Sequence, residues 1–333
     1  MVQKPKSAFA VACANVALIK YWGKRNGMIN LPAVGSISLT LEALKTRTRV
    51  TFDPELEADN LIINNHQATD HQQQRIAQFL NIIREKSGTH LFAKIISENN
   101  FPTAAGLASS ASGFAALAMA AASALKLNLS KEALSGLSRL GSGSAARSIY
   151  GGIVEMQKGH DSSGKEDFAV QLAPPEYWDL RVLVLVTSKE EKKTGSTNAM
   201  NISAKTSPYY TSWVASSAVD LDEMRDAIRK KDFEKLGDLT EFSTLKMHAL
   251  TLSSKPPVIY WNSRTLELIE QTRELRFGGV PVYFTIDAGP QVKLITLPEH
   301  MKTLSQHFGS IPWIEKLLET KLGPDALLIG ENH

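Results

Sequence analysis

Hydrophobic and polar residues alternate in several short runs of the first half of the chain. Residues 7–14 and 46–52 combine this alternation with β-branched side chains, and residues 61–64 and 91–97 have similar patterns. Successive side chains of a strand face opposite sides, so these runs predict strands. Residues 71–86 instead place apolar side chains three or four positions apart, which predicts a helix.

An alanine-rich segment follows these elements, because 11 of the 23 residues from 103 to 125 are alanine. We expect this segment to be largely helical. Ser130 is a suitable N-cap for a second helix over residues 131–140. Apolar runs at residues 151–157 and 180–187 predict further strands.

Helical spacing dominates the start of the second half. Ser207 and Pro208 suit the N-cap and first position of a helical region that continues to about Met247, with a break near Lys231. The pair Pro256-Pro257 ends this region. Further elements are predicted as a helix over 261–276, paired strands at 282–287 and 293–297, a short helix over 299–308 and a last strand at 326–329.

This order of elements predicts an α+β protein of two closely packed lobes with a cleft between them. We place the boundary near residue 178, which gives an N-terminal lobe of residues 1–178 and a C-terminal lobe of residues 179–333. The length of 333 residues is ample for two lobes with a shared core.

Composition narrows the class of protein. The chain is 43% hydrophobic and 21% charged, which excludes a disordered chain, and its formal charge of +3 is too small for a broad nucleic-acid-binding face. Cys13 is the single cysteine, so no intrachain disulfide can form, and a reducing cytoplasm is the expected compartment. Residues 8–19 are apolar, but Asn15 and Lys20 interrupt a leader-like pattern, and no run is long enough to predict a membrane helix.

Two loops rich in glycine and serine could hold an anion. Residues 102–113 lie between a predicted strand and the alanine-rich helix, where small residues and the helix start favour phosphate groups. No lysine lies between Lys94 and Lys126, so this loop is not a Walker A motif. The alternative is a flexible entry to a tightly packed helix.

The second loop, residues 141–147 (GSGSAAR), formally matches the dinucleotide-binding pattern G-x-G-x-x-A. That pattern must follow a strand, whereas this loop follows a predicted helix, so a dinucleotide-binding fold is not expected. The loop is therefore interpreted as an anion-binding turn with Arg147 attached, and the alternative is a surface turn with a solvated arginine.

Three further segments carry polar groups that could reach a substrate. Residues 21–25 (YWGKR) place an aromatic donor and two cations beside a buried strand, and residues 195–197 add hydroxyl groups. Asp287 follows an apolar run, where burial is costly unless a cation or a substrate hydroxyl pairs with it. Its alternative role is to cap a turn. The histidines lack the spacing of a zinc site.

Four segments together resemble the motifs of the mevalonate diphosphate decarboxylases, a family of the GHMP kinase superfamily. They are residues 15–24 (NVALIKYWGK), 102–111 (PTAAGLASSA), 141–147 (GSGSAAR) and 285–290 (TIDAGP), and they occur in the family's order. The resemblance implies an N-terminal lobe like ribosomal protein S5 domain 2, a ferredoxin-like C-terminal lobe, an inter-lobe active site and a homodimer.

The resemblance also implies a reaction: conversion of 5-diphosphomevalonate and ATP, with Mg²⁺, into isopentenyl diphosphate, ADP, phosphate and CO₂ in the mevalonate pathway. Catalytic roles are implied for Asp287 near the C3 hydroxyl, Arg147 on the C1 carboxylate and Lys24 as an orienting cation. Substrate-binding residues implied by the resemblance are Tyr21, Trp22, Gly23, Lys24, Arg75, Ser142, Gly143, Ser144, Ala145, Ala146, Arg147 and Thr197. ATP-binding residues are Gly106, Leu107, Ala108, Ser109 and Ser110, with Ser110 as the candidate contact to Mg²⁺.

One departure from the family pattern keeps alternatives open. Val34 stands where the family usually has asparagine, which removes a polar group near the expected pocket. The alternatives are the same chemistry on 5-phosphomevalonate, a GHMP kinase that does not decarboxylate, and an inactive ligand sensor.

Overall fold

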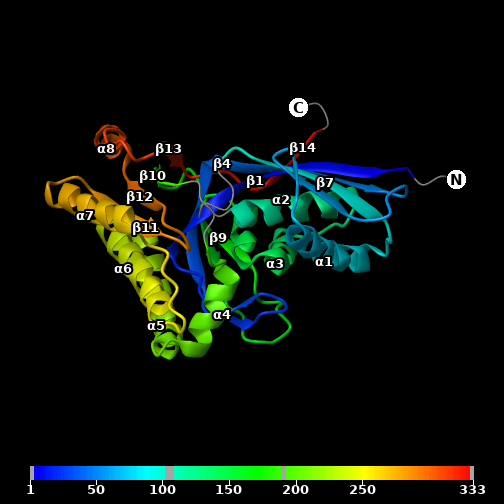
Figure 1. Ribbon diagram of the computed structural model, residues 1–333, viewed down its shortest axis with the longest axis horizontal. Coiled ribbons are helices and arrows are strands. Elements are labelled where there is room, and N and C mark those ends of the chain that lie inside the picture. Colours follow the sequence, from blue (N-terminus) through cyan, green and yellow to red (C-terminus); the bar gives the residue numbers. More distant parts are fainter. Residues whose placement is uncertain (1–3, 102–108, 189–192, 331–333) are drawn as a thin grey trace.

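The computed structural model describes residues 4–101, 109–188 and 193–330 (Figure 1). Within these ranges the strands form two larger sheets and a short hairpin, and helices cover both larger sheets. The mixed α+β class predicted from the sequence is confirmed. None of the described helices is long and apolar enough to cross a lipid bilayer.

The first sheet has eight strands. Its main path is β14-β1-β4-β7-β5-β6, β8 pairs with β4 and with β9, and every pair is antiparallel except β5 with β7. The strands are β1 (Lys6–Ile19), β4 (Ser36–Asp53), β5 (Asn60–Ile63), β6 (His66–Gln67), β7 (Phe92–Asn99), β8 (Ile153–Met156), β9 (Ala169–Ala173) and β14 (Leu327–Ile329). β1 and β4 are the longest of these strands. The C-terminal end of β1 and the N-terminal end of β4 lie next to Arg147 of the predicted site.

Three helices cover one face of this sheet (Figure 1). They are α1 (Asp70–Ser87), α2 (Ser109–Ala124) and α3 (Lys131–Gly141), and α3 continues into the 3₁₀ segment η1 (Gly143–Ile149). Ser130 caps α3 as predicted, by accepting a hydrogen bond from the backbone of Ala133. The many alanines of α2 are buried, and their small volume lets α2 pack closely against the sheet.

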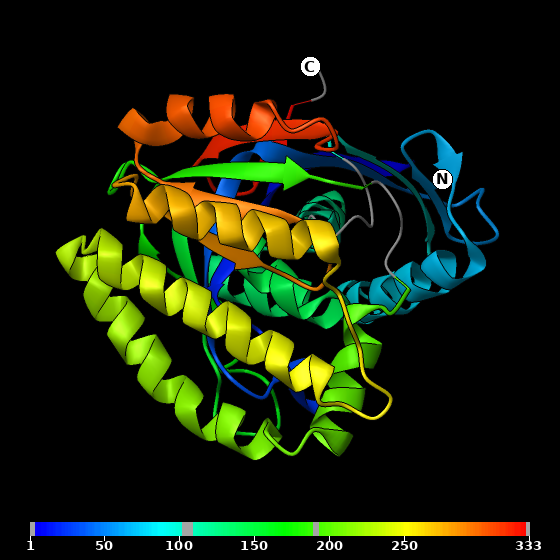
Figure 2. The same ribbon diagram turned by 60° about the vertical axis from the view of Figure 1, so that its left-hand side comes forward.

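The second sheet has the order β11-β12-β10-β13, and its pairs are antiparallel. Its strands are β10 (Arg181–Val186), β11 (Val282–Ile286), β12 (Val292–Thr296) and β13 (Lys316–Lys321). Its neighbouring helices are α4 (Ser196–Thr206), α5 (Tyr210–Lys230), α6 (Phe233–Leu252), α7 (Ser263–Phe277), the short η2 (Pro298–His300) and α8 (Met301–Gly309). Figure 2 shows α5, α6 and α7 side by side, with α6 (yellow) next to β11.

A hydrophobic cluster joins the two halves of the chain. It contains Val16 and Leu39 of the first sheet together with Val184 and Leu236 of the second half. The last strand, β14, also returns to pair with β1. The boundary near residue 178 stays a prediction, and the two lobes share apolar core across it.

Three local predictions were wrong or incomplete. Ser207 does not start a helix: it ends α4, and α5 begins at Tyr210. Residues 195–197, which were selected for their hydroxyl groups, lie at the start of α4, a helix that the sequence pattern did not predict. The edge strands β9 and β13 were missed as well, because their mixed polar sequences give only a weak alternation.

Candidate active site

Asp287 lies at the end of β11, where its carboxylate meets two lysines. Lys20 Nζ donates a hydrogen bond to one carboxylate oxygen at 2.8 Å, and Lys293 Nζ donates to the other at 3.3 Å. Both lysines are almost fully buried, whereas the Asp287 side chain is 25% exposed and so remains accessible to a ligand. Asp287 therefore has the cationic partners that its position after an apolar run called for. They are Lys20 and Lys293, which the sequence motifs did not single out as site residues.

The ion pair sets the charge state of Asp287. Burial alone would raise the pKa of its carboxyl group, but the Lys20 and Lys293 ammonium groups outweigh burial and hold that pKa well below its usual range. Burial lowers the pKa of Lys20 to about 8, although Asp287 opposes this shift. Lys20 Nζ is also fixed by the hydroxyl of Thr285 at 2.6 Å and the carbonyl of Ala17 at 3.1 Å. At neutral pH the centre therefore holds an ionised, oriented carboxylate.

Arg147 is a buried cation of a different kind. It is 2% exposed, and its guanidinium donates hydrogen bonds to the hydroxyls of Ser36 and Ser38 and to Oδ1 of Asn15. No carboxylate of the described residues lies within ion-pair distance of it, and burial lowers its pKa to about 10. The alternative of a solvated surface turn is wrong for this loop. A buried guanidinium with neutral partners is suited to receive an anion from outside.

Tyr21 and Gly143 meet beside Arg147. The Tyr21 hydroxyl is buried and has no hydrogen-bond partner among the described residues. A Cβ atom at Gly143 would lie 2.2 Å from this hydroxyl, so glycine is required for the present position of the ring. An unpaired buried hydroxyl is a donor that a bound ligand can satisfy.

Some of the residues that the resemblance selected lie in the core. The Trp22 side chain is 2% exposed within an apolar cluster, while its carbonyl accepts a hydrogen bond from Trp213. Ala145 and Ala146 are fully buried. Any ligand contact of these residues would have to use the backbone. Gly23 has a φ of +93°, a conformation that favours glycine between Trp22 and Lys24.

Three segments that are distant in sequence converge at Lys24. Its ammonium group lies 3.4 Å from the hydroxyl of Thr197 on α4. Burial, together with the nearby charge of Arg75 on α1, lowers the pKa of Lys24 to about 8. Arg75 donates a hydrogen bond to the carbonyl of Gly141 at 2.7 Å and lies over the ring of Phe114. The structure therefore gathers two cations next to the second glycine-serine loop.

Serine hydroxyls connect the two glycine-serine loops. Ser142 Oγ lies 3.4 Å from Ser110 Oγ and 3.3 Å from Ser144 Oγ. Ser109 and Ser110 also line a cavity of about 200 Å³ that Arg75 borders. Gly106, Leu107 and Ala108 lie outside the described residues.

The cavity beside Ser110 is lined by hydroxyl, amide and guanidinium groups, and no carboxylate is among its described lining residues. The described part of the chain contains no cluster of three or more metal-ligating His, Cys, Asp or Glu side chains. Mg²⁺ is commonly held through substrate phosphates with few protein ligands, and hydroxyl oxygens are suitable ligands for it. The serines around Ser110 therefore fit a metal ion that arrives with a nucleotide.

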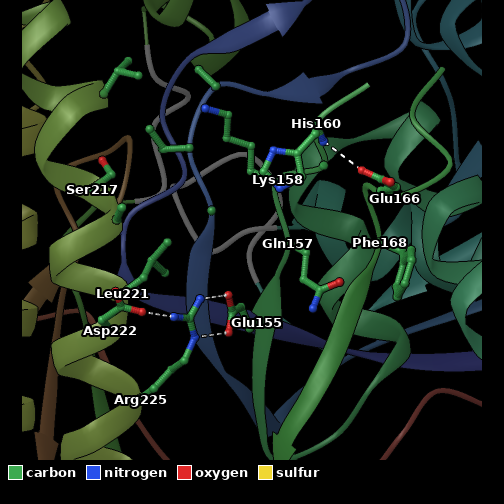
Figure 3. A pocket seen from close by; sticks show the side chains of 16 residues that line it. Glu155, Gln157, Lys158, His160, Glu166, Phe168, Ser217, Leu221, Asp222 and Arg225 are labelled. Carbon is green, nitrogen blue, oxygen red and sulfur yellow. Dashed lines mark hydrogen bonds and ion pairs between the residues drawn. The ribbon is translucent and has the colours of Figure 1, made fainter. Parts of the chain in front are cut away.

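A larger cavity lies elsewhere, between α5 and the segment after β8 (Figure 3). Its volume is about 660 Å³, but Arg225 is bound there by both Glu155 and Asp222, and Glu166 accepts a hydrogen bond from the backbone of His160. The lining carries three carboxylates, Glu155, Glu166 and Asp222, against the two cations Lys158 and Arg225, so this cavity does not suit a phosphorylated ligand. Val34 lines it and is 2% exposed.

Comparisons with known proteins identify the family of the chain. Residues 12–169 match the diphosphomevalonate decarboxylase-like N-terminal domain, and residues 182–321 match the mevalonate 5-diphosphate decarboxylase C-terminal domain. The human protein named diphosphomevalonate decarboxylase is 38% identical over 89% of this chain and 78% of its own length.

Solved structures give the same result. Mevalonate diphosphate decarboxylase from Staphylococcus aureus is 37% identical with a TM-score of 0.93, and 98% of each chain is covered. A protein named MDDEF, solved in complex with MVAPP, AMPPCP and magnesium, is 41% identical with a TM-score of 0.91, over 98% of this chain and 99% of that one. Two domain matches and similarity along nearly the whole chain place this protein in the mevalonate diphosphate decarboxylase family, with its GHMP kinase fold.

Proposed function

We propose that this chain converts 5-diphosphomevalonate and ATP into isopentenyl diphosphate, ADP, phosphate and CO₂ in the mevalonate pathway. The observation that carries the proposal is that an ionised Asp287 lies near the buried Arg147, which has no carboxylate partner among the described residues. The two groups would have complementary roles: Asp287 would contact the C3 hydroxyl of the substrate, and Arg147 would contact its C1 carboxylate.

The chemistry needs both tasks. A tertiary hydroxyl is a poor leaving group, and transfer of the γ-phosphoryl group to the C3 oxygen turns it into phosphate, which leaves readily. As the C3–O bond breaks, the bond between C2 and the C1 carboxylate also breaks, and its electron pair forms the new double bond while CO₂ departs. Arg147 would hold that carboxylate in line for this step.

Asp287 acts on the C3 hydroxyl. Because Lys20 and Lys293 keep it ionised, its carboxylate can accept the hydrogen bond of the hydroxyl and orient the oxygen toward the phosphoryl group. A carboxylate with such a low pKa is a weak base at rest, so proton transfer becomes favourable only as the new P–O bond makes the hydroxyl acidic. We therefore assign orientation first and proton acceptance second.

The 5-diphosphate group needs several donors and positive charge. Tyr21 offers a hydroxyl that no described residue hydrogen-bonds, and Ser142 and Ser144 offer further hydroxyls. Lys24 and Arg75 offer positive charge at the same loop. Two cations for a group with about three negative charges suit an electrostatic clamp.

The nucleotide would bind on the side of Ser109 and Ser110. The cavity of about 200 Å³ opens next to these serines, and its lining includes the apolar side chains of Ile63, Ile95 and Leu117. Mg²⁺ bound there with the nucleotide supplies positive charge to the transferring phosphoryl group. Ser110 is the residue of this chain that we expect to contact it.

The test is a turnover assay on the purified protein with ATP, Mg²⁺ and 5-diphosphomevalonate, in which ADP and CO₂ are both measured. We expect equal amounts of the two products. ADP without CO₂ would support a kinase that does not decarboxylate, and neither product from a folded sample would refute the proposal. A parallel reaction with 5-phosphomevalonate compares kcat/KM for the two substrates; we expect the diphosphate to be preferred because of the two cations at the second loop.

Three further properties remain proposals. The resemblance supports a homodimer, the single buried Cys13 supports a cytoplasmic location, and the two sheets support lobes of residues 1–178 and 179–333. Val34 no longer argues for the monophosphate, because its side chain packs in an apolar cluster with Trp22 and Trp213.

A further inference from the structure

One face of helix α6 follows strand β11 residue by residue. Gly237, Glu241, Thr244 and His248 are spaced by four, three and four positions, so they form one stripe along the helix. Each of these four residues contacts a successive residue of the strand that ends at Asp287. The contacts differ in kind, and together they fix the strand in a single register.

The stripe begins with close packing. A Cβ atom at Gly237 would lie 2.1 Å from the ring of Tyr283, so this glycine lets the helix approach the strand. One turn later, the carboxylate of Glu241 accepts the backbone N–H of Phe284 at 3.1 Å, and Arg276 holds that carboxylate in place.

The stripe continues toward the active site. The hydroxyl of Thr244 lies 3.4 Å from the hydroxyl of Thr285. The Thr285 hydroxyl also accepts a hydrogen bond from the Lys20 ammonium group. His248 Nε2 lies 3.3 Å from the carbonyl oxygen of Ile286, the residue directly before Asp287. A carbonyl oxygen can only accept a hydrogen bond, so Nε2 must carry the proton.

The other member of the ion pair is held by the same helix. Ser243 Oγ accepts the backbone N–H of Lys20 at 2.9 Å. Helix α6 therefore contacts the backbone of Lys20, directly after β1, and the backbone of Ile286, the last residue of β11. These contacts lie at or next to the two members of the ion pair, which are 267 residues apart in sequence.

The surroundings of His248 favour this role. Its ring is 1% exposed, packs on Trp261 with ring centroids 4.6 Å apart and meets the edge of Tyr260. Burial, together with the nearby charge of Lys20, lowers the pKa of His248 to about 3, although the hydrogen bond to Ile286 and the charge of Asp287 oppose this shift. The imidazole is therefore neutral. A neutral ring adds no charge to the ion pair and can serve as a rigid donor.

We propose that α6 is the positioning element of the Lys20–Asp287 pair and that His248 is its positioning residue, acting through the carbonyl of Ile286. The role rests on the proposed function, since it assigns Asp287 to the C3 hydroxyl. His248 touches neither substrate nor nucleotide in this role. Its loss should therefore reduce kcat more than it changes KM. A displaced Asp287 carboxylate still allows the substrate to bind, but it is poorly oriented toward the C3 hydroxyl.

The experiment separates the hydrogen bond from the packing of the ring. His248→Phe keeps an aromatic ring and removes the donor, while His248→Gln restores a donor at similar reach. We expect His248→Phe to lower kcat by about 10- to 100-fold with KM within about twofold, and His248→Gln to recover most of the loss. Phe242→Ala, on the exposed face of the same helix, is the matched control and should keep the wild-type kcat.

Two results would overturn the proposal: a His248→Phe variant with wild-type kcat, or a His248→Gln variant as slow as His248→Phe at the same Tm. If His248→Phe does not fold, ¹⁵N NMR of the wild-type histidines decides the contact, since we expect His248 as the neutral Nε2–H tautomer at pH 7. An Nδ1–H tautomer would refute the hydrogen bond. This measurement needs no turnover, so it remains valid even if the wild-type protein lacks the proposed activity.

Discussion

Asp287 and Arg147 are two charged side chains of one site, and their surroundings differ: the Asp287 side chain is 25% exposed, whereas Arg147 is buried. The carboxylate has two internal cations, Lys20 and Lys293. Among the described residues, the guanidinium instead hydrogen-bonds to neutral groups such as Asn15. A charged side chain with oppositely charged partners inside the protein is held in a fixed position. A charged side chain with neutral partners retains its attraction for an oppositely charged ligand. The difference indicates that Asp287 is built to orient and Arg147 is built to bind.

The largest effect on activity is expected at Asp287, the charge with internal partners. Asp287→Asn keeps the shape of the side chain but removes its charge, so the ligand should bind while kcat falls by about 10²- to 10⁴-fold. Product formation gives kcat, and calorimetry with 5-diphosphomevalonate gives the affinity. Near-normal turnover would remove the assigned role of Asp287.

A substitution of Arg147, the charge with neutral partners, should mainly weaken substrate binding. Arg147→Lys keeps a cation but loses the planar fork that can hold a carboxylate through two hydrogen bonds, so affinity should fall by about 100-fold. Calorimetric Kd and thermal unfolding, measured on the same sample, separate binding from folding. An unchanged Kd would show that the buried guanidinium serves packing alone.

The lysines predict a dependence on pH. Lys24 and Lys20 each have a pKa lowered to about 8, so both are charged at pH 7 and lose their charge as the pH rises through that value. We expect kcat/KM to fall above pH 8. Arginine stays charged at these pH values, so Lys24→Arg should reduce the loss at pH 9 by about tenfold. An identical fall in both proteins would assign the pH dependence to Lys20 instead.

The smallest effect is expected at Tyr21, whose hydroxyl has no hydrogen-bond partner within the described ranges of the chain. Tyr21→Phe should leave the free energy of unfolding unchanged or raise it by about 1 kcal/mol, because a buried unpaired group is removed. KM for the diphosphate substrate should rise by about five- to tenfold, as one hydrogen bond is lost. A destabilised variant with unchanged KM would place the hydroxyl in the fold rather than in the site.

Local patterns identified several elements correctly. The helix over 71–86 appears as α1, the cap at Ser130 starts α3, and the paired strands around the Gly-Pro turn appear as β11 and β12. These features depend on neighbours within a few residues, which a single sequence contains. The Ser207 cap failed because the preceding residues form a helix of their own, so the same serine ends α4.

The sequence by itself determined the chemistry that the site could offer: two glycine-serine loops, Arg147 after the second, Lys24 after an apolar strand and Asp287 after another. Only the tertiary structure decided which groups meet. Lys20 and Lys293 look like interruptions of apolar runs until the end of β1 and strand β12 come next to the end of β11. The polar stripe of α6 likewise resembles an ordinary helix face until it is seen against β11. The physical reason is that a buried charge takes its state from its neighbours in space, and those neighbours can be hundreds of residues apart in sequence.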